Sequence, residues 1–124
     1  MIPEKHRLPL KSQFPYLKKE GRLYQSYLFG LLLAPQLKEK LPFRTAFVIS
    51  TKVDKKANKR NKARRWLKEA LNLYLPSLKP GWDGVFLGKK ALIGSNFGLV
   101  KKEMEAIFKK ANLLQNKTYE KNIT

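Results

Sequence analysis

The sequence contains no cysteine, a single histidine and few acidic residues. Without cysteine, disulfides and thiolate metal sites are excluded. The histidine, His6, lies in a proline-flanked N-terminal segment without a local partner, where we expect it to be mobile rather than catalytic. The nine acids are scattered, and Glu103 and Glu105 are two positions apart on a predicted helix, so they point to different sides. We therefore expect no catalytic residues and no carboxylate metal site on this chain.

Long apolar runs are also missing. No stretch approaches the roughly 20 apolar residues that a membrane-spanning helix needs. The first residues, MIPEKHRLPLKSQF, lack the apolar core of a signal peptide. We expect a cytoplasmic protein that does not enter a membrane.

What the sequence does contain is positive charge and enough apolar residues to fold. Its 124 residues are 43% hydrophobic, which suits one domain with a single core. Lys and Arg number 27 against nine acids, a formal net charge of +18. The usual partners of so basic a domain are nucleic acid or an anionic membrane surface.

Apolar periodicity, turn residues and prolines predict the order helix, strands, helix, strand, helix. The expected helices are 14–19, 57–75 and one that follows Ser95 or Asn96; the expected strands are 25–35, 43–51 and 85–88. This order predicts an α+β or α/β two-layer sandwich, a small mixed sheet packed with about three helices. We expect residues 1–114 to form one α/β domain and residues 115–124 a polar, disordered tail; the motif described below makes this an RNA-binding domain by resemblance.

Three details of these elements carry expectations of their own. Ser12 is the expected cap of the first helix, with Pro15 in its first turn and Gly21 at its end. In the first strand, one face is expected to carry alternate apolar residues, Tyr27, Phe29, Leu31 and Leu33. Leu28 and Leu32 are expected on the other face, so both faces of this strand should be covered.

The stretch KKANKRNKARRWLKEAL, residues 55–71, combines a core face with an unusual excess of cations. Its apolar residues recur at helical spacing: Ala63, Trp66, Leu67, Ala70 and Leu71, continued by Tyr74. Eight of its seventeen residues are Lys or Arg, and Glu69 is the only acid among them. A solvated charged face is the ordinary explanation. The missing acids and the Arg side chains, whose planar fork suits phosphate, favour binding to a polyanion.

The same stretch resembles the Arg-Asn motif helix of the bacterial ribonuclease P protein subunit. The matching residues, in order and spacing, are Ala57, Arg60, Asn61, Arg64, Arg65, Lys68 and Glu69. The segments VISTK, RLPLKSQFPYLKKEGR and WDGVFLGKK resemble the family's flanking patterns, so the similarity runs from about residue 7 to residue 114.

This resemblance implies a fold and a function. It implies a left-handed β-α-β crossover, an exception to the usual right-handed rule. It implies a partner, the ribonuclease P catalytic RNA, which removes the 5′ leader of precursor tRNA with Mg²⁺ bound mainly by the RNA. No obligate protein partner is implied.

The resemblance also implies two sets of binding residues. The residues that would face the catalytic RNA are Lys55, Lys56, Arg60, Asn61, Lys62, Arg64, Arg65 and Lys68. A cleft between the sheet and the first helix would hold the single-stranded leader, with Phe14, Tyr27 and Phe29 to stack bases and Lys52 to meet a phosphate. The alternative is that these aromatics are core residues, as most large aromatics are.

Three other functions compete with this interpretation. A general RNA-binding protein, ribosomal or tRNA-binding, shares the charge and the fold class. A helix-turn-helix DNA binder would need a second helix a few residues from the charged one, and none is predicted there. A membrane-surface protein would need the apolar arc of the charged helix, which the sheet already uses.

Overall fold

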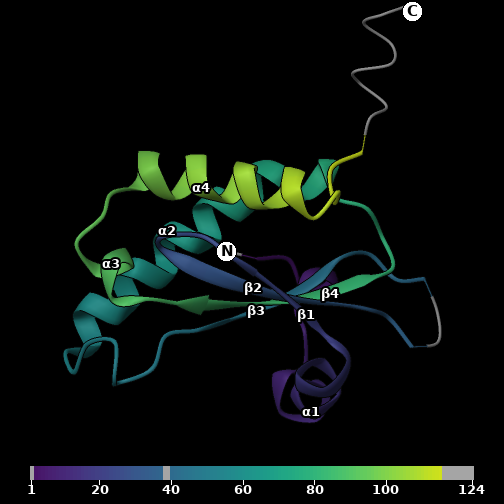
Figure 1. Ribbon diagram of the computed structural model, residues 1–124, viewed down its shortest axis with the longest axis horizontal. Helices are drawn as coiled ribbons and strands as arrows, with labels where there is room; N and C mark the ends of the chain where they lie inside the picture. Colours follow the sequence, from purple (N-terminus) through teal and green to yellow (C-terminus); the bar gives the residue numbers. More distant parts are fainter. Residues whose placement is uncertain (1, 38–39, 116–124) are drawn as a thin grey trace, which may run out of the picture.

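The computed structural model describes residues 2–37 and 40–115 (Figure 1). Its centre is a four-stranded sheet in the order β1-β2-β4-β3. The strands are β1 (Arg22–Gln25), β2 (Phe29–Pro35), β3 (Arg44–Val48) and β4 (Trp82–Gly88). β2 pairs antiparallel with both β1 and β4, whereas β3 runs parallel to β4, so the predicted mixed sheet is confirmed.

Helices cover both faces of the sheet (Figure 1). One face carries α1 (Leu10–Glu20), and the other carries α2 (Ala57–Tyr74), the short α3 (Lys90–Ile93) and α4 (Phe97–Lys110). Two 3-10 turns, Glu4–His6 and Leu75–Ser77, complete the described elements. The α+β class is confirmed, and α2 connects the parallel strands β3 and β4. The left-handed sense of that crossover stays a prediction.

Strand β2 is apolar on both sides because helices lie on both sides. Phe29, Leu31 and Leu33 belong to the larger core cluster, which includes the buried residues of α2 and α4. Leu32 and Ala34 alternate with them and belong to a smaller cluster with α1. A strand buried on two faces reads as a continuous apolar run, as expected from the sequence.

The larger core is organised around an aromatic residue of β4. Phe86 is fully buried, and its ring centroid lies 5.6 Å from that of Phe29 and 5.5 Å from that of Phe47. The ring of Phe108, on α4, lies 6.2 Å away at a steep angle. Edge-on and stacked pairs of this kind add to the stability that area burial provides.

The apolar face predicted for residues 57–75 is confirmed. Ala63, Leu67, Ala70 and Leu71 of α2 are buried, and Trp66 and Tyr74 pack against them half-buried. The helix continues into the Leu75–Ser77 turn at Pro76, since proline cannot continue the hydrogen-bond ladder.

The predicted strand 25–35 is a hairpin with a turn inside it. β1 ends at Gln25 and β2 begins at Phe29, and the Ser26 side chain closes the turn. Its Oγ accepts the N–H groups of Leu28 and Phe29, each at 3.2 Å. Tyr27 therefore lies outside the strand, and Leu28 joins the larger cluster instead of the opposite face.

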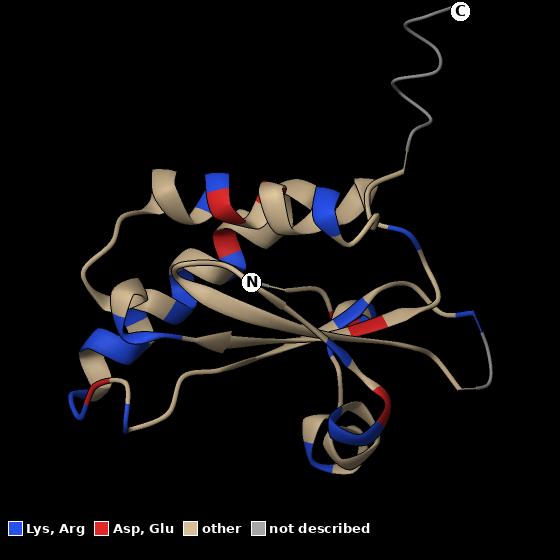
Figure 2. Cartoon of the chain, viewed as in Figure 1, with Lys and Arg blue, Asp and Glu red and all other residues tan. Residues whose placement is uncertain are grey.

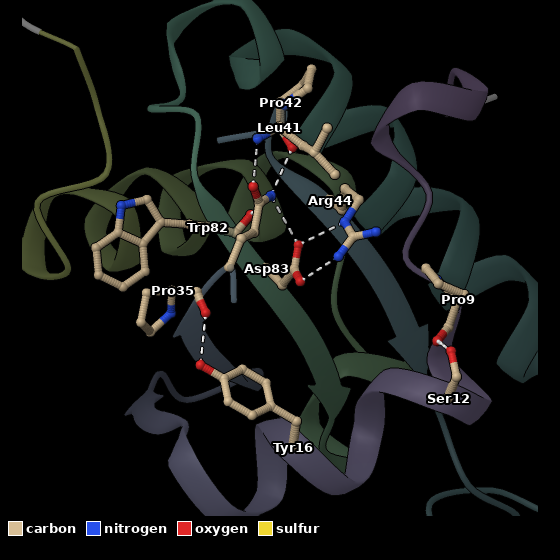
Figure 3. Close-up of polar contacts among 10 residues, drawn as sticks. Pro9, Ser12, Tyr16, Pro35, Leu41, Pro42, Arg44, Trp82 and Asp83 are labelled. Atoms are coloured by element: carbon tan, nitrogen blue, oxygen red, sulfur yellow. Dashed lines mark hydrogen bonds and ion pairs between the residues drawn. The ribbon is translucent and has the colours of Figure 1, made fainter. Parts of the chain in front are cut away.

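Helix α1 begins four residues earlier than predicted, at Leu10. Ser12 is not its cap, because its hydroxyl donates to the carbonyl of Pro9 at 3.1 Å (Figure 3). Pro15 consequently lies in the second turn. Because proline has no N–H, the carbonyl of Lys11 receives no helical hydrogen bond from this position. Gly21 does end the helix, and its N–H donates to the carbonyl of Leu17 at 2.7 Å.

The N-terminal segment is fixed to the sheet, so the expectation that His6 is mobile is wrong. Its Nδ1 donates to the carbonyl of Phe43 at 2.7 Å. The N–H of Leu8 donates to the carbonyl of Thr45, on β3, at 2.9 Å. These bonds anchor the chain just before α1 crosses beneath the sheet.

The C-terminal third differs from the prediction in its boundaries and in one additional short helix. β4 starts at Trp82 instead of residue 85, and α3 was not predicted. Asn96, rather than Ser95, caps α4, since its Oδ1 accepts the N–H of Leu99 at 2.9 Å. Gln115 is bonded to the carbonyl of Ser77, and the rest of the predicted tail, 116–124, lies outside the described residues.

Candidate RNA-binding surface

Helix α2 carries most of its cations in its N-terminal half (Figure 2), and none of them is among its buried residues. Of the residues that the resemblance assigns to RNA, five are exposed: Lys55, Lys56, Asn61, Lys62 and Arg65. The other three, Arg60, Arg64 and Lys68, are half-buried. The ion pairs formed between described residues are Arg44–Asp83 and Glu105–Lys109, and neither involves α2. The cations of α2 therefore form no ion pair with any carboxylate of the described part of the chain.

Arg60 has a structural task. Its Nη1 donates to the carbonyls of Asp54 and Lys55, at 2.8 and 2.9 Å. The Asp54 side chain in turn accepts the N–H of Lys56 at 2.8 Å. These bonds fix residues 54–56, just before α2, and this segment carries the candidate phosphate-binding residues Lys55 and Lys56. Arg60 therefore positions two other cations in addition to carrying a charge itself.

Two further side-chain contacts order the basic surface of α2. Arg64 donates through Nη1 to Oδ1 of Asn61 at 2.8 Å, one turn earlier. The ammonium of Lys62 lies 5.5 Å from the centroid of the Trp66 ring. A cation held over an indole face is attracted to the ring electrons, so Lys62 is partly oriented before any ligand arrives.

A groove lies on the other face of the sheet, beside α1. Figure 1 looks nearly along the axis of α1, which crosses beneath the strands near the start of β4. The Tyr16 hydroxyl donates to the carbonyl of Pro35 at 2.9 Å, on the side of α1 towards that end of the sheet (Figure 3). The opposite side of α1 lines an open hollow with Leu10, Lys11, Phe14, Pro15, Lys18 and Lys19.

The lining of the hollow comes from α1, and the half-buried apolar residues of the sheet that share a cluster with Phe14 are called the floor of the groove here. Phe14 packs in one cluster with Leu32, Ala46, Val48 and Leu87, which come from three neighbouring strands. Ala46, Val48 and Leu87 were not among the residues expected at the site. The alternation of side chains along a strand could have identified them, because each is next in sequence to a residue that faces the opposite side of the sheet.

Two lysines of α1 lie beside Phe14 at the edge of the groove. Lys18 lies one turn after Phe14, and its ammonium is 5.6 Å from the centroid of the Phe14 ring. Lys11 precedes Phe14 by one turn and is exposed. An aromatic ring between two lysines, over an apolar floor, offers a nucleobase a stacking surface and its phosphates two counter-charges.

The four residues expected in the leader cleft are not together. Phe14 lines the groove, and Lys52 is exposed in the turn after β3. Phe29 is 0% exposed and packs beneath α2 and α4, so its assignment to the cleft is wrong. Strand alternation turns Phe29 to the face opposite α1. Tyr27 is exposed in the β1–β2 turn, where its N–H donates to Glu103 of α4.

A buried polar network fixes the end of the sheet beyond α1 (Figure 3). Asp83 of β4 accepts two hydrogen bonds from Arg44 of β3, and this hydrogen bonding to the carboxylate raises the pKa of Arg44. The side-chain amide of Gln36 also donates to Asp83, at 3.1 Å, and its Oε1 accepts the N–H of Leu41 at 2.7 Å. The network ties β3 and β4 to the connection that follows β2.

The acidic side chains are dispersed over the described part of the chain. No group of three or more Asp, Glu or His side chains lies close enough together in residues 2–37 and 40–115 to hold a metal ion. Several carboxylates have other partners: Asp83 binds Arg44, Asp54 binds the N–H of Lys56, and Glu105 binds Lys109.

None of the described helices has both the length and the hydrophobicity that a membrane crossing requires.

Comparisons with known proteins identify a family that covers nearly the whole chain. The family model described as Ribonuclease P matches residues 2–112. A ribonuclease P protein component from Synechococcus sp. is 34% identical over 116 residues, 92% of this chain and 87% of that protein. One from Chloroflexus aurantiacus is 35% identical over 116 residues, 93% of this chain and 84% of that protein.

Solved structures resemble the chain as well. The RNase P protein from Thermotoga maritima is 27% identical, with a TM-score of 0.73 over 84% of this chain and 96% of that one. The RNase P protein of Staphylococcus aureus has a TM-score of 0.79 over 89% of this chain and 98% of that one, at 17% identity. This second likeness concerns the fold alone. The chain belongs to the ribonuclease P protein family, the protein components of the endoribonuclease that acts in tRNA 5′ processing.

Proposed function

We propose that this protein holds two RNA segments at once, one on each side of its sheet. The basic surface of α2 contacts the catalytic RNA, and the groove beside α1 receives the single-stranded leader of precursor tRNA. One observation carries the proposal. The cations of α2 and the Phe14 groove lie on opposite faces of the sheet, so neither ligand blocks the other.

Leader binding in the groove follows from general physical chemistry. Every base has a π-face, so stacking on Phe14 tolerates different leader sequences. Lys11 and Lys18 at the rim supply charge to the backbone, and Lys52 adds charge beyond the end of β3. The proposed result is affinity for an unpaired strand without base-specific readout.

The proposed contribution to cleavage is binding and electrostatics. Mg²⁺ is proposed to reside on the RNA, where it supplies the hydrolytic chemistry. The chain's own lysines and arginines neutralise phosphates, so they lower the repulsion between catalytic RNA and precursor. The proposed partners are the catalytic RNA and precursor tRNA, without an obligate protein partner, and the proposed location is the cytoplasm.

Reconstitution tests this proposal. The protein is combined with a bacterial ribonuclease P RNA, and 5′ leader removal is followed over a Mg²⁺ series at fixed monovalent salt. The protein should lower the Mg²⁺ concentration that cleavage requires, because phosphate repulsion is least screened when Mg²⁺ is scarce. The protein without RNA should not cleave.

A charge-matched pair of variants makes the result specific. Replacing Arg64, Arg65 and Lys68 by Ala should abolish the stimulation at low Mg²⁺. Replacing three exposed lysines of α4 instead, Lys101, Lys102 and Lys110, should leave most of it. Equal losses in the two variants would favour a general basic RNA-binding protein, and cleavage by the RNA-free protein would contradict the assignment of catalysis to the RNA.

A further inference from the structure

Strand β1 leaves one edge of the sheet open. The strand order is β1-β2-β4-β3, so no strand of the described residues lies beyond β1. The opposite edge differs, because the N–H of Leu8 donates to the carbonyl of Thr45 at 2.9 Å and the N-terminal segment covers part of β3. An open edge carries main-chain N–H and C=O groups with which another extended chain can pair.

The hydrogen bonds of the β1–β2 hairpin show which main-chain groups face this edge. The N–H of Ser26 donates to the carbonyl of Phe29 at 2.8 Å, so these two residues form a pair of the hydrogen-bonded kind. Hydrogen-bonded and non-hydrogen-bonded pairs alternate along antiparallel strands. In the observed register Leu23 and Gln25 belong to the second kind. Their N–H and C=O groups therefore point away from β2, towards the open edge.

The side chains at this edge differ between the two faces of the sheet. On the face of α4, the guanidinium carbon of Arg22 lies 5.8 Å from the centroid of the Tyr24 ring, and Lys110 lines the same hollow. Neither cation takes part in the ion pairs formed between described residues. On the face of α1, Leu23 is 47% exposed and is not in the cluster of Phe14. The edge is thus basic on one face and apolar on the other.

We propose that β1 binds an extended acidic segment of another protein, which adds a strand to the sheet at this edge. The main chain of the segment pairs with Leu23 and Gln25. Because side chains alternate along a strand, its carboxylates lie beside Arg22 and Lys110, while its apolar side chains cover Leu23 on the other face. The partner is additional to the RNA and is not obligatory for cleavage.

Charge and geometry together favour this occupant. The net charge of +18 makes a second copy of the chain repel the first, whereas an acidic segment is attracted. RNA would satisfy Arg22 and Lys110, but it would leave the outward main-chain groups of β1 and the exposed Leu23 unused. An extended acidic peptide with alternate apolar residues uses all of them.

The test adds a short synthetic peptide of alternating Glu and Val to the isotopically labelled full chain and follows amide signals by NMR at one fixed salt concentration. The amides of Leu23 and Gln25 should shift and become protected from hydrogen exchange. Attraction of the peptide to the cations of α2 gives separate signals. A peptide of the same composition with its Glu residues clustered should bind β1 roughly tenfold more weakly.

Methylated peptides test the strand pairing directly. Methylation of the amide nitrogens on one edge of the peptide should abolish binding to β1, whereas methylation on the other edge should not, because an added strand pairs through one edge only. Equal binding of the two methylated peptides, or shifts confined to α2, would show that the inference is wrong.

Variants separate the contributions of charge and main chain. Arg22→Glu combined with Lys110→Glu should weaken peptide binding at β1 roughly tenfold or more. The same charge change elsewhere on α4, Lys101→Glu with Lys102→Glu, should leave it nearly unchanged. Leu23→Pro removes an outward N–H and no hydrogen bond to β2, and should also weaken binding roughly tenfold.

Two other occupants are outcomes of the same experiments. If a single-stranded RNA oligonucleotide shifts the β1 amides and the peptide does not, the edge is an RNA contact and the inference is overturned. Self-association of the peptide-free chain that Leu23→Pro abolishes, measured by sedimentation, would assign the edge to a second copy and overturn it as well. The proposed binding of RNA by α2 and by the groove stands or falls separately, because it involves other residues.

Discussion

Arg44 on β3 holds Asp83 on β4 through two parallel hydrogen bonds, Nε to Oδ1 at 2.9 Å and Nη2 to Oδ2 at 2.8 Å. Asp83 is 1% exposed, so its carboxylate has given up nearly all of its water. The Gln36 amide supplies a third donor. A buried carboxylate is tolerated here because a cation and an amide replace its solvent.

Arg44→Ala should lower the free energy of unfolding by about 3–5 kcal/mol, because it leaves the Asp83 carboxylate buried without a cation. Urea denaturation followed by circular dichroism measures this. Replacing both residues by Leu should recover much of the loss, since the unpaired charge is then absent as well. A loss for Arg44→Ala below about 1 kcal/mol would mean that water reaches the carboxylate.

Substitution of Phe29 should mainly lower stability, whereas substitution of Phe14 should mainly affect ligand binding. Phe29→Ala removes a fully buried ring and should cost about 3–5 kcal/mol of unfolding free energy. Phe14→Ala removes a half-buried ring at the groove and should cost clearly less. Denaturant unfolding of the two variants under identical conditions measures both values. Equal losses would place Phe14 in the core rather than in a ligand site.

Much of the charged helix could be predicted from the sequence. The 3.6-residue period of the apolar residues from Ala63 to Tyr74 identifies the buried face, so the cations between them occupy the other faces of the helix. The scarcity of acids predicts that these cations have few ion-pair partners. The structural task of Arg60 could not be predicted, because it depends on how the carbonyls of residues 54 and 55 turn towards the helix.

The groove could be predicted only in part. Alternation places Phe29 and Leu32 on different faces of β2, but it cannot say which face α1 covers or where the helix crosses. That crossing is a tertiary feature, set by the anchoring of Leu8 to Thr45. The turn at Tyr27 was missed because it lacks the Asn-Gly or Asp-Gly signal of short hairpins, and the Ser26 hydroxyl closes it instead.

Substitution of Arg65 should affect RNA binding alone, whereas substitution of Arg60 should affect both RNA binding and the melting temperature. Arg65→Ala should reduce the slope of log K against log salt for catalytic-RNA binding by about 1, with an unchanged melting temperature, because its side chain is exposed. Arg60→Ala should lower both RNA affinity and melting temperature, since the 54–56 segment loses its anchor. A melting temperature lowered equally by both substitutions would contradict the separate roles.

Tyr74 should make stability depend on alkaline pH. Burial, followed by the hydrogen bond to Glu105 at 3.1 Å, raises the pKa of Tyr74 to about 12 from its ordinary 10. The folded state therefore favours the neutral phenol. This stabilisation is complete below pH 10 and is lost as the pH rises through about 12.

The matched variant for this effect is Tyr74→Phe, which has no phenol to titrate. The difference in unfolding free energy between wild type and Tyr74→Phe should shrink between pH 10 and pH 12, measured by urea denaturation at each pH. Lysine titration affects both proteins and cancels in the difference. A constant difference across this range would show that the phenol is not desolvated in the folded protein.

The central claim is that a groove with an aromatic wall holds the leader while α2 holds the catalytic RNA. The most direct measurement is the ratio of holoenzyme affinities for precursor and mature tRNA at one fixed salt concentration, with wild type and with Phe14→Ala combined with Lys52→Ala. The wild type should prefer the precursor, and the double variant should lose much of that preference while it binds the catalytic RNA as before. An unchanged preference in a folded double variant, or an equal loss of affinity for all three RNAs, would contradict the account.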